Sequence, residues 1–326
     1  MREFHPRFRN ASDDEINAAT FELSDAQLTI SREYGFPNWQ RLRAYVADPN
    51  RLDVRLPRHE RIKDKAFRRA VDLLDAGEAE GLRAHLAANP DLVRRRVTFD
   101  GENYFTHPAL LAFVAENPTR KGTQPSNIVD VASVILEAGG AADQASKDET
   151  LGLVSSSSVA RTCGVQIALV DLLCGYGADP NAGVFEALLY GEFDAVNRLI
   201  ERGAQISLTL AAALGRNDDV RRLLPQSDGE SRQRALGLAA QHGRVDVVRM
   251  LLDAGEDPNR YSPVGGHSHA TPLHQAALAG HEQIVQLLVE RGARTDIKDI
   301  HYNSTPLGWA EHAGNAQIAE YLRAND

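Results

Sequence analysis

Histidine is the residue type that most suggests chemistry in this chain, which carries eleven of them. His267, His269, Asp299, His301 and Tyr302 lie on two neighbouring segments near the C-terminal end. An imidazole beside a carboxylate makes a general acid–base pair, because the carboxylate holds the ring in one tautomer. Aromatic rings with a few hydrogen-bonding groups also make a binding hot spot. Histidines with an acid suit zinc as well, but no local zinc spacing occurs here, so we expect no metal.

Two further aromatic residues extend this group along the chain. Tyr261 precedes the first two histidines, and Trp309 follows Tyr302 by seven positions. Recognition of a partner, packing between loops, and catalysis or metal binding are all open interpretations, and the mixture of rings and polar groups favours recognition. We therefore expect the contact residues to be Tyr261, His267, His269, His301, Tyr302 and Trp309.

A second group of polar residues occurs earlier in the chain. Asp100-Gly101 is a typical hairpin turn, and Glu102, Asn103 and Tyr104 follow it. His107 precedes Pro108 where a helix is expected to start, so it either caps that helix or faces the same side as Glu102. The candidate catalytic residues are therefore His107, Glu102, His301 and Asp299, acting as metal-independent acid–base groups.

The familiar catalytic and cofactor motifs do not occur. The sequence has no G-x-S-x-G elbow, phosphate-binding loop, G-x-G-x-x-G or H-E-x-x-H. Cys163 and Cys174 are eleven positions apart, which fits neither a redox pair nor a zinc site, so we expect reduced packing residues. We expect no cofactor, and the question of an enzymatic activity stays open.

Composition excludes several classes of protein. The net charge is −9, which argues against nucleic acid as a partner, because binding it needs a basic face. No apolar run reaches the ~18 residues of a membrane span, and the N-terminus lacks a secretory signal. These features predict a cytoplasmic protein without a membrane partner. Residues 41–70 hold ten Lys/Arg and four Asp/Glu, which suits either an anionic partner or a solvated linker.

The elements that position these residues follow from an internal repeat. Thr271–His281 returns as Thr305–Asn315 at an offset of 34. In each copy a threonine caps a helix and a proline occupies its first position, which needs no N–H partner. Gly280 ends the first helix, an apolar stripe marks a second, and Gly292 provides a stop with positive φ. Two such short helices must stack on neighbours to bury a core.

These residues resemble the ankyrin repeat family. Thr271–Ala277, Gly280-His281, Val285–Leu288 and Gly292-Ala293 match its consensus. The resemblance implies an all-α helical-repeat solenoid with short β-hairpin fingers and a helical N-terminal cap. It also implies that His274 bonds to backbone between loops and that His281, which follows the interhelical glycine, is structural.

Weaker copies extend the repeat towards the N-terminus. We expect a helical leader or cap over residues 1–50, a basic linker over 51–65, and about eight irregular repeats over 66–326. The leader resembles short helical segments ahead of ankyrin arrays in many bacterial proteins, which suggests a bacterial source. The fourth and fifth repeats are short, so each should keep its helix pair and lose most of its finger.

The resemblance implies a scaffold that binds a protein partner through a concave groove and finger tips. The alternative is an enzyme or a small-molecule-binding protein, with His and acid groups in a groove pocket. The irregular repeats motivate that alternative, since a simple interaction array has no need to break its period. A regulatory partner encoded beside its target is a third interpretation. By register Trp309 aligns with Gln275, a position that faces the groove in this family.

Overall fold

The computed structural model describes residues 12–33, 36, 38–47, 58–99, 104–264 and 267–325. The chain divides into two compact units, Met1–Arg61 and Ile62–Asp326. The predicted boundaries of the leader, linker and array stay a prediction, since residues 48–57 lie outside the described part. No helix among the described residues is long and apolar enough to cross a lipid bilayer.

The first unit contains short helices, as expected for a helical leader. They are α1 (Asp13–Ala18), α2 (Leu23–Glu33), α3 (Trp39–Ala47) and the 3-10 turn η2 (Arg58–Arg61). Ser12 and Glu15 form a capping box at the start of α1. The Phe36 and Tyr45 rings pack with their centroids 5.1 Å apart. Several large apolar side chains stay exposed on this unit, among them Leu23 at 75%.

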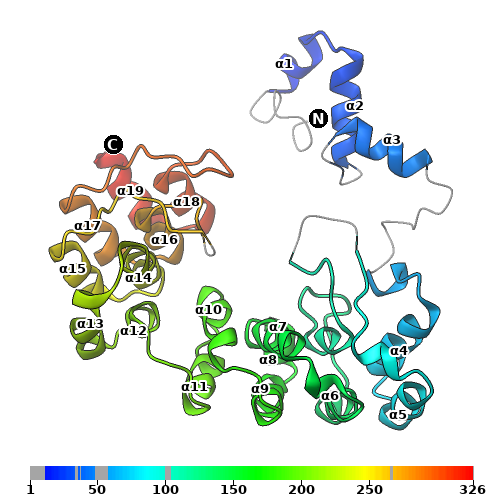
Figure 1. Ribbon diagram of the computed structural model, residues 1–326. Helices are drawn as coiled ribbons and strands as arrows, with labels where there is room; N and C mark the ends of the chain where they lie inside the picture. The colour runs from blue at the N-terminus through cyan, green and yellow to red at the C-terminus, as the bar shows by residue number, and fades with distance from the viewer. Residues whose placement is uncertain are drawn as a thin grey trace. The chain divides into compact units, whose positions relative to one another are not determined.

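The second unit is a series of helix pairs (Figure 1). The pairs are α4 (Lys65–Asp75) with α5 (Ala79–Ala88), η4 (Leu110–Ala115) with α6 (Ile128–Glu137), α7 (Gln144–Ser155) with α9 (Gln166–Gly175), α10 (Asn181–Leu189) with α11 (Phe193–Glu201), α12 (Leu208–Leu214) with α13 (Asn217–Leu223), α14 (Gly229–Gln241) with α15 (Val245–Asp253), α16 (Pro272–Ala279) with α17 (Glu282–Glu290), and α18 (Pro306–Ala313) with α19 (Ala316–Ala324). Shorter turns lie between them: η3 (Pro90–Val93), η5 (Gly140–Ala142), α8 (Ser158–Thr162) and η6 (Leu224–Gln226). First helices of successive pairs pack on one another, as α14, α16 and α18 do.

The caps predicted from the repeat are confirmed. Thr271 and His274 form a capping box at α16, and Gly280 ends that helix in the left-handed conformation with φ of 79°. Gly292 has φ of 87° after α17. His274 Nε2 contacts the Ser304 carbonyl, so its imidazole bonds to backbone as expected, and His281 Nε2 contacts the Gln241 carbonyl.

The fingers between pairs differ from the predicted β-hairpins. The described residues contain helices and turns, and their one isolated β-bridge joins Arg96 to Ala109. The last finger closes with backbone bonds from Asp299 N–H to the Ser304 carbonyl and from Asn303 N–H to the Asp299 carbonyl. The finger before η4 has two bonds across it, from Val97 N–H to the Pro108 carbonyl and from Phe99 N–H to the Thr106 carbonyl.

Both cysteines are free thiols, but only one packs. Cys174 is half-buried against the core and burial raises the pKa of its thiol. Cys163 is exposed, so the expectation that it is a packing residue is wrong. It is the C-cap of α8, which consists of five residues and turns outward after Ala160.

Two hydrophobic cores divide the second unit. The first runs from Ile62 through α4 to α11 and takes in Leu210 and Ala213 of α12 and Leu238 of α14, and the second runs from Leu208 to Leu322. Ile206, between α11 and α12, packs against both cores. The two short repeats keep a helix pair each, and α12 has only seven residues.

We call the region where the two cores meet, around Ile206, the joint. Side chains from the end of α14 reach across it to α10, past the short pair of α12 and α13. Gln241 Nε2 donates to the Leu189 carbonyl at 2.9 Å, and His242 Nε2 lies 2.8 Å from the Leu188 carbonyl. Both carbonyls belong to the last turn of α10, and that of Leu188 also accepts the backbone N–H of Gly191. The His242 ring also meets Phe193 edge-on, with centroids 5.1 Å apart.

Acidification is expected to weaken this joint. Burial lowers the pKa of His242 to about 4, against 6.5 for a free imidazole. The unfolded chain therefore binds the proton first, and stability falls from about pH 6.5 down to pH 4, by ~3 kcal/mol for this group. Urea unfolding at several pH values will measure the slope. In His242→Gln, which keeps a donor for Leu188, that part of the slope should vanish, and an unchanged slope would contradict the assignment.

Candidate functional site

Asp299 organises the last finger. Its carboxylate accepts backbone N–H bonds from His301 and Tyr302 at 2.9 and 2.7 Å, and from Ser304 at 3.0 Å. The Trp309 indole donates a fourth bond at 3.1 Å. Burial alone raises the pKa of this carboxyl, but these four donors outweigh it and hold the pKa below its usual value. The backbone of the finger thus folds around the Asp299 carboxylate, which accepts all four of these hydrogen bonds.

The predicted aromatic residues meet above this carboxylate. The ring centroids of His269 and His301 are 4.5 Å apart, and His269 lies 5.6 Å from Trp309. Tyr302 and His267 contact the edge of His269, with centroids 6.2 and 6.0 Å away. We call this set the histidine patch: His267, His269, His301, Tyr302 and Trp309.

Tyr261 contacts the backbone next to Asp299 and not the rings of the patch. Its hydroxyl donates to the Lys298 carbonyl at 2.7 Å, which ties the finger before α16 to the finger before α18. Sequence reasoning therefore placed all six expected contact residues in one region of the fold. Whether they contact a partner is a separate question.

The exposed fractions of these side chains differ from what we expected. Tyr302 is 61% exposed and His301 is exposed, whereas Trp309 is only 8% exposed and lies beneath His269. Gln275, the residue with which Trp309 aligns, is 3% exposed. The prediction that Trp309 faces an open groove is therefore wrong, because the Asp299 carboxylate draws its indole inward.

The surroundings of the patch lower the pKa of two of its imidazoles. Burial lowers the pKa of His267 and of His269, and neighbouring imidazoles lower that of His269 further. The pKa of His274, on the far side of Trp309, is lowered by burial too. Among the residues that the structure describes, no group of three or more His, Cys, Asp or Glu is arranged to hold a metal ion.

The expected acid–base pair at His301 and Asp299 is not formed. Asp299 contacts the backbone N–H of His301 and not its ring. All four hydrogen bonds that stabilise the carboxylate come from groups that do not titrate near neutral pH. The carboxylate therefore shapes the turn instead of setting an imidazole tautomer.

The second predicted group is only partly described. Asp100, Glu102 and Asn103 lie outside the described residues. His107 is exposed, and its Nδ1 contacts the neighbouring Thr106 hydroxyl at 3.1 Å.

His107 does not cap a helix. The following helix, η4, starts at Leu110 with Ala109 as its N-cap. The expectation of a helix start at His107-Pro108 is wrong, because Val97 N–H donates to the Pro108 carbonyl and keeps this segment extended.

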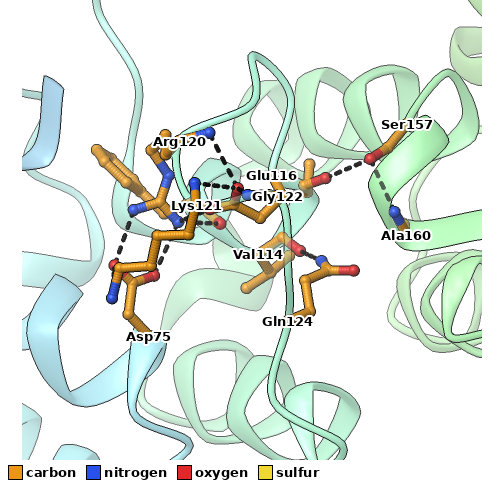
Figure 2. Close-up of polar contacts among 11 residues, drawn as sticks. Asp75, Val114, Glu116, Arg120, Lys121, Gly122, Gln124, Ser157 and Ala160 are labelled. Carbon is orange, nitrogen blue, oxygen red and sulfur yellow. Dashed lines mark hydrogen bonds and ion pairs between the residues drawn. The ribbon is translucent and has the colours of Figure 1, made fainter. Parts of the chain in front are cut away.

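Sequence reasoning missed a buried ionic cluster between the first two helix pairs (Figure 2). Arg120 donates two bonds to Asp75, at 2.9 and 2.8 Å, and lies 2.7 Å from Glu116. These three side chains are only 2 to 4% exposed. Lys121 adds a fourth charge 3.3 Å from Asp75, and Phe113 lies under the guanidinium at 5.1 Å.

The cluster holds an insertion between η4 and α6. Glu116, in the left-handed conformation with φ of 48°, accepts the backbone N–H of Arg120 and Lys121 at 3.0 and 2.9 Å. Figure 2 also shows Gln124 and Ser157, which donate to the carbonyls of Val114 and Ala115. These bonds hold the insertion against η4. One signal was available: the repeat at 105–142 exceeds the ~33 residues of a full unit.

Comparison with known proteins identifies the repeats. Family models described as "Ankyrin repeats (3 copies)" match residues 184–262 and 263–326, and one described as "Ankyrin repeats (many copies)" matches 236–289. The mouse (Mus musculus) Ankyrin repeat and SAM domain-containing protein 6 is 46% identical over 69 residues, and its rat (Rattus norvegicus) counterpart 44%.

These curated relatives cover little of the chain. The matched segment is 21% of this chain and spans only 8% of either relative. The bacterial origin stays a prediction. The matched repeats nevertheless coincide with the helix pairs from α10 to α19, so residues 184–326 are similar to ankyrin repeats in both sequence and helix order.

Proposed function

We propose that this chain recognises a protein partner through the histidine patch and the finger tips around it. Ankyrin repeats indicate a protein–protein interaction scaffold. The observation that carries the proposal is the exposure of apolar side chains on the two last fingers. Ile300 is 64% exposed, Val264 is 88% exposed and Tyr302 is 61% exposed.

The rigidity of the last finger also supports the proposal that it binds a partner. The four bonds to Asp299 hold the backbone under His301 and Tyr302, and Trp309 supports the rings from below. A surface that is already ordered loses little conformational entropy when a partner binds. Aromatic residues on such a surface are typical anchors of protein interfaces.

The enzymatic alternative gains no support from the patch. An acid–base mechanism at His301 needs a carboxylate free to orient the ring, and Asp299 is fully occupied by other donors. The remaining candidate, His107, contacts a hydroxyl and not an acid.

Affinity capture with variants of the full chain tests the proposal. The double variant His301→Ala, Tyr302→Ala removes the exposed rings, while the Asp299 carboxylate still holds the backbone. Tyr190→Ala is the matched control, since Tyr190 is equally exposed, at 66%, on another helix pair. We expect a partner from lysate of the source organism to be retained by wild type and control and lost by the double variant.

Two further results decide the test. The melting temperature of the double variant should match that of the control, which excludes unfolding as the cause of the loss. A partner that the double variant retains as well as wild type does would show that recognition uses another surface.

A further inference from the structure

We propose that His267 couples the histidine patch to the joint, so that a fall in pH loosens both together. The inference deepens the proposed function by giving it a regulation, in which a partner held at the patch is released in acid. That consequence rests on the proposed function. The coupling itself does not, and it can be measured without a partner.

His267 belongs to both regions of the fold. Its ring contacts the edge of His269 in the patch, with centroids 6.0 Å apart. The same ring lies at the end of α10, where the backbone of Leu189 favours its protonated form. Gln241, from the end of α14, donates to the carbonyl of this Leu189 at 2.9 Å. The last turn of α10 is therefore held by the end of α14 and also by the finger that carries the patch.

The backbone of His267 shows that its position is enforced. Its φ is 45°, in the left-handed region that is uncommon for residues with a β-carbon. Such a backbone persists only where the surrounding contacts fix it. Here the carbonyl of His267 accepts the N–H of Ala270 at 3.0 Å, which closes a turn around His269. When the ring of His267 leaves α10, this turn can relax and displace His269, whose ring covers Trp309.

Protonation acts against the closed contact with α10. Burial lowers the pKa of His267 below 6.5 and that of His242 to about 4, so an open form, in which both rings meet water, binds protons first. The closed form is therefore fully favoured above about pH 6.5 and is lost as the pH falls. Between about pH 7.5 and about pH 5, His242 alone shifts the ratio of open to closed form about thirtyfold towards opening.

The charged groups around the two rings do not oppose this effect. Arg244 and His281 lower the pKa of His242 further, as His267 does. Burial also lowers the pKa of His269, the titratable neighbour of His267 on the finger. The pKa of His267 is set by burial and by the Leu189 backbone. The charged residues on the helices that meet at the joint are Glu186 on α10 and Glu230, Arg232 and Arg234 on α14.

The fluorescence of Trp309 tests the coupling in the full chain. Trp39→Phe removes the other tryptophan, and the remaining signal then reports on the ring that His269 covers. We expect a transition in this signal as the pH falls from about 7.5 to about 5, with an unchanged far-UV circular dichroism spectrum. In the same background, His242→Gln keeps a donor for Leu188 but does not titrate. It should lower the midpoint of the transition by about half a pH unit or more.

Two further variants complete the comparison. Asparagine tolerates a left-handed backbone and does not titrate, so His267→Asn should also lower the midpoint. His312→Gln is the matched control, because His312 is an exposed histidine on α18, the helix that carries Trp309. The control should leave the midpoint unchanged.

Each outcome decides the coupling. A lower midpoint in His242→Gln and His267→Asn, but not in the control, supports it. A midpoint that His242→Gln leaves unchanged overturns it, because the patch then responds only to its own histidines. A Trp309 signal that does not change with pH also overturns it. These results are independent of the capture of a partner, so a failure of the coupling and a failure of the proposed function are distinguishable.

Discussion

Replacing Arg120 with methionine is expected to lower the free energy of unfolding by about 3–5 kcal/mol. The substitution leaves Asp75 and Glu116, which are 4% and 3% exposed, without their main counter-charge. Two carboxylates in such a site cannot recover full hydration in the folded state, and only Lys121 remains near Asp75. Urea unfolding of the full chain, followed by circular dichroism, measures the loss.

A matched exposed ion pair supplies the control for this experiment. Arg83 lies 2.8 Å from Glu137, with the two side chains 50% and 46% exposed. Arg83→Met should cost less than about 1 kcal/mol, because water compensates both charges. Arg120→Lys should be intermediate, since an ammonium cannot reproduce the two parallel bonds to Asp75. Equal losses of unfolding free energy at the exposed and the buried arginine would show that the buried cluster stabilises the fold no more than an exposed ion pair does.

The second large effect concerns the contact between inner helices. Ala277 on α16 is fully buried in the second core, where α16 packs against α14 and α18. Ala277→Arg forces either a buried guanidinium or separation of the helices, and we expect a loss of about 4 kcal/mol or more.

A neighbour on the same helix provides the control for Ala277→Arg. Ala279 is exposed, and Ala279→Arg should change stability by no more than about 0.5 kcal/mol. Thermal unfolding of both variants separates packing from charge. If Ala277→Arg melts within a degree or so of the control, α16 does not pack as the structure has it.

The helix pairs were predictable because local rules decide them. Thr271, Pro272 and Gly280 mark the ends of α16 by their own conformational preferences, with no help from distant residues. The same rules found helix pairs in the shortened repeats, where α12 starts after a capping Ser207 and ends at Gly215. The expected β-hairpins are not formed as strands in the described residues, where the finger before η4 has two cross-finger backbone bonds and one isolated bridge.

The sequence predicted which residues form the histidine patch, but not how deeply each of them is buried. Register alone brought His269, His301 and Tyr302 together, since adjacent fingers stand side by side. The burial of Trp309 depends on where the Asp299 carboxylate turns, which is a contact across ten positions of the chain. The ionic cluster depends on Asp75 and Arg120, which are 45 positions apart, and no local pattern links them.

The joint at Ile206 has a consequence for the cooperativity of the array. Repeat proteins unfold as one unit only while each interface between neighbours is strong. Here the two cores share α12, where Leu210 and Ala213 belong to the first core and Leu208 and Ala211 to the second. Polar bonds from Gln241 and His242 to α10 add to this coupling between the C-terminal repeats and the N-terminal core. An acid environment, which protonates His242, weakens that coupling.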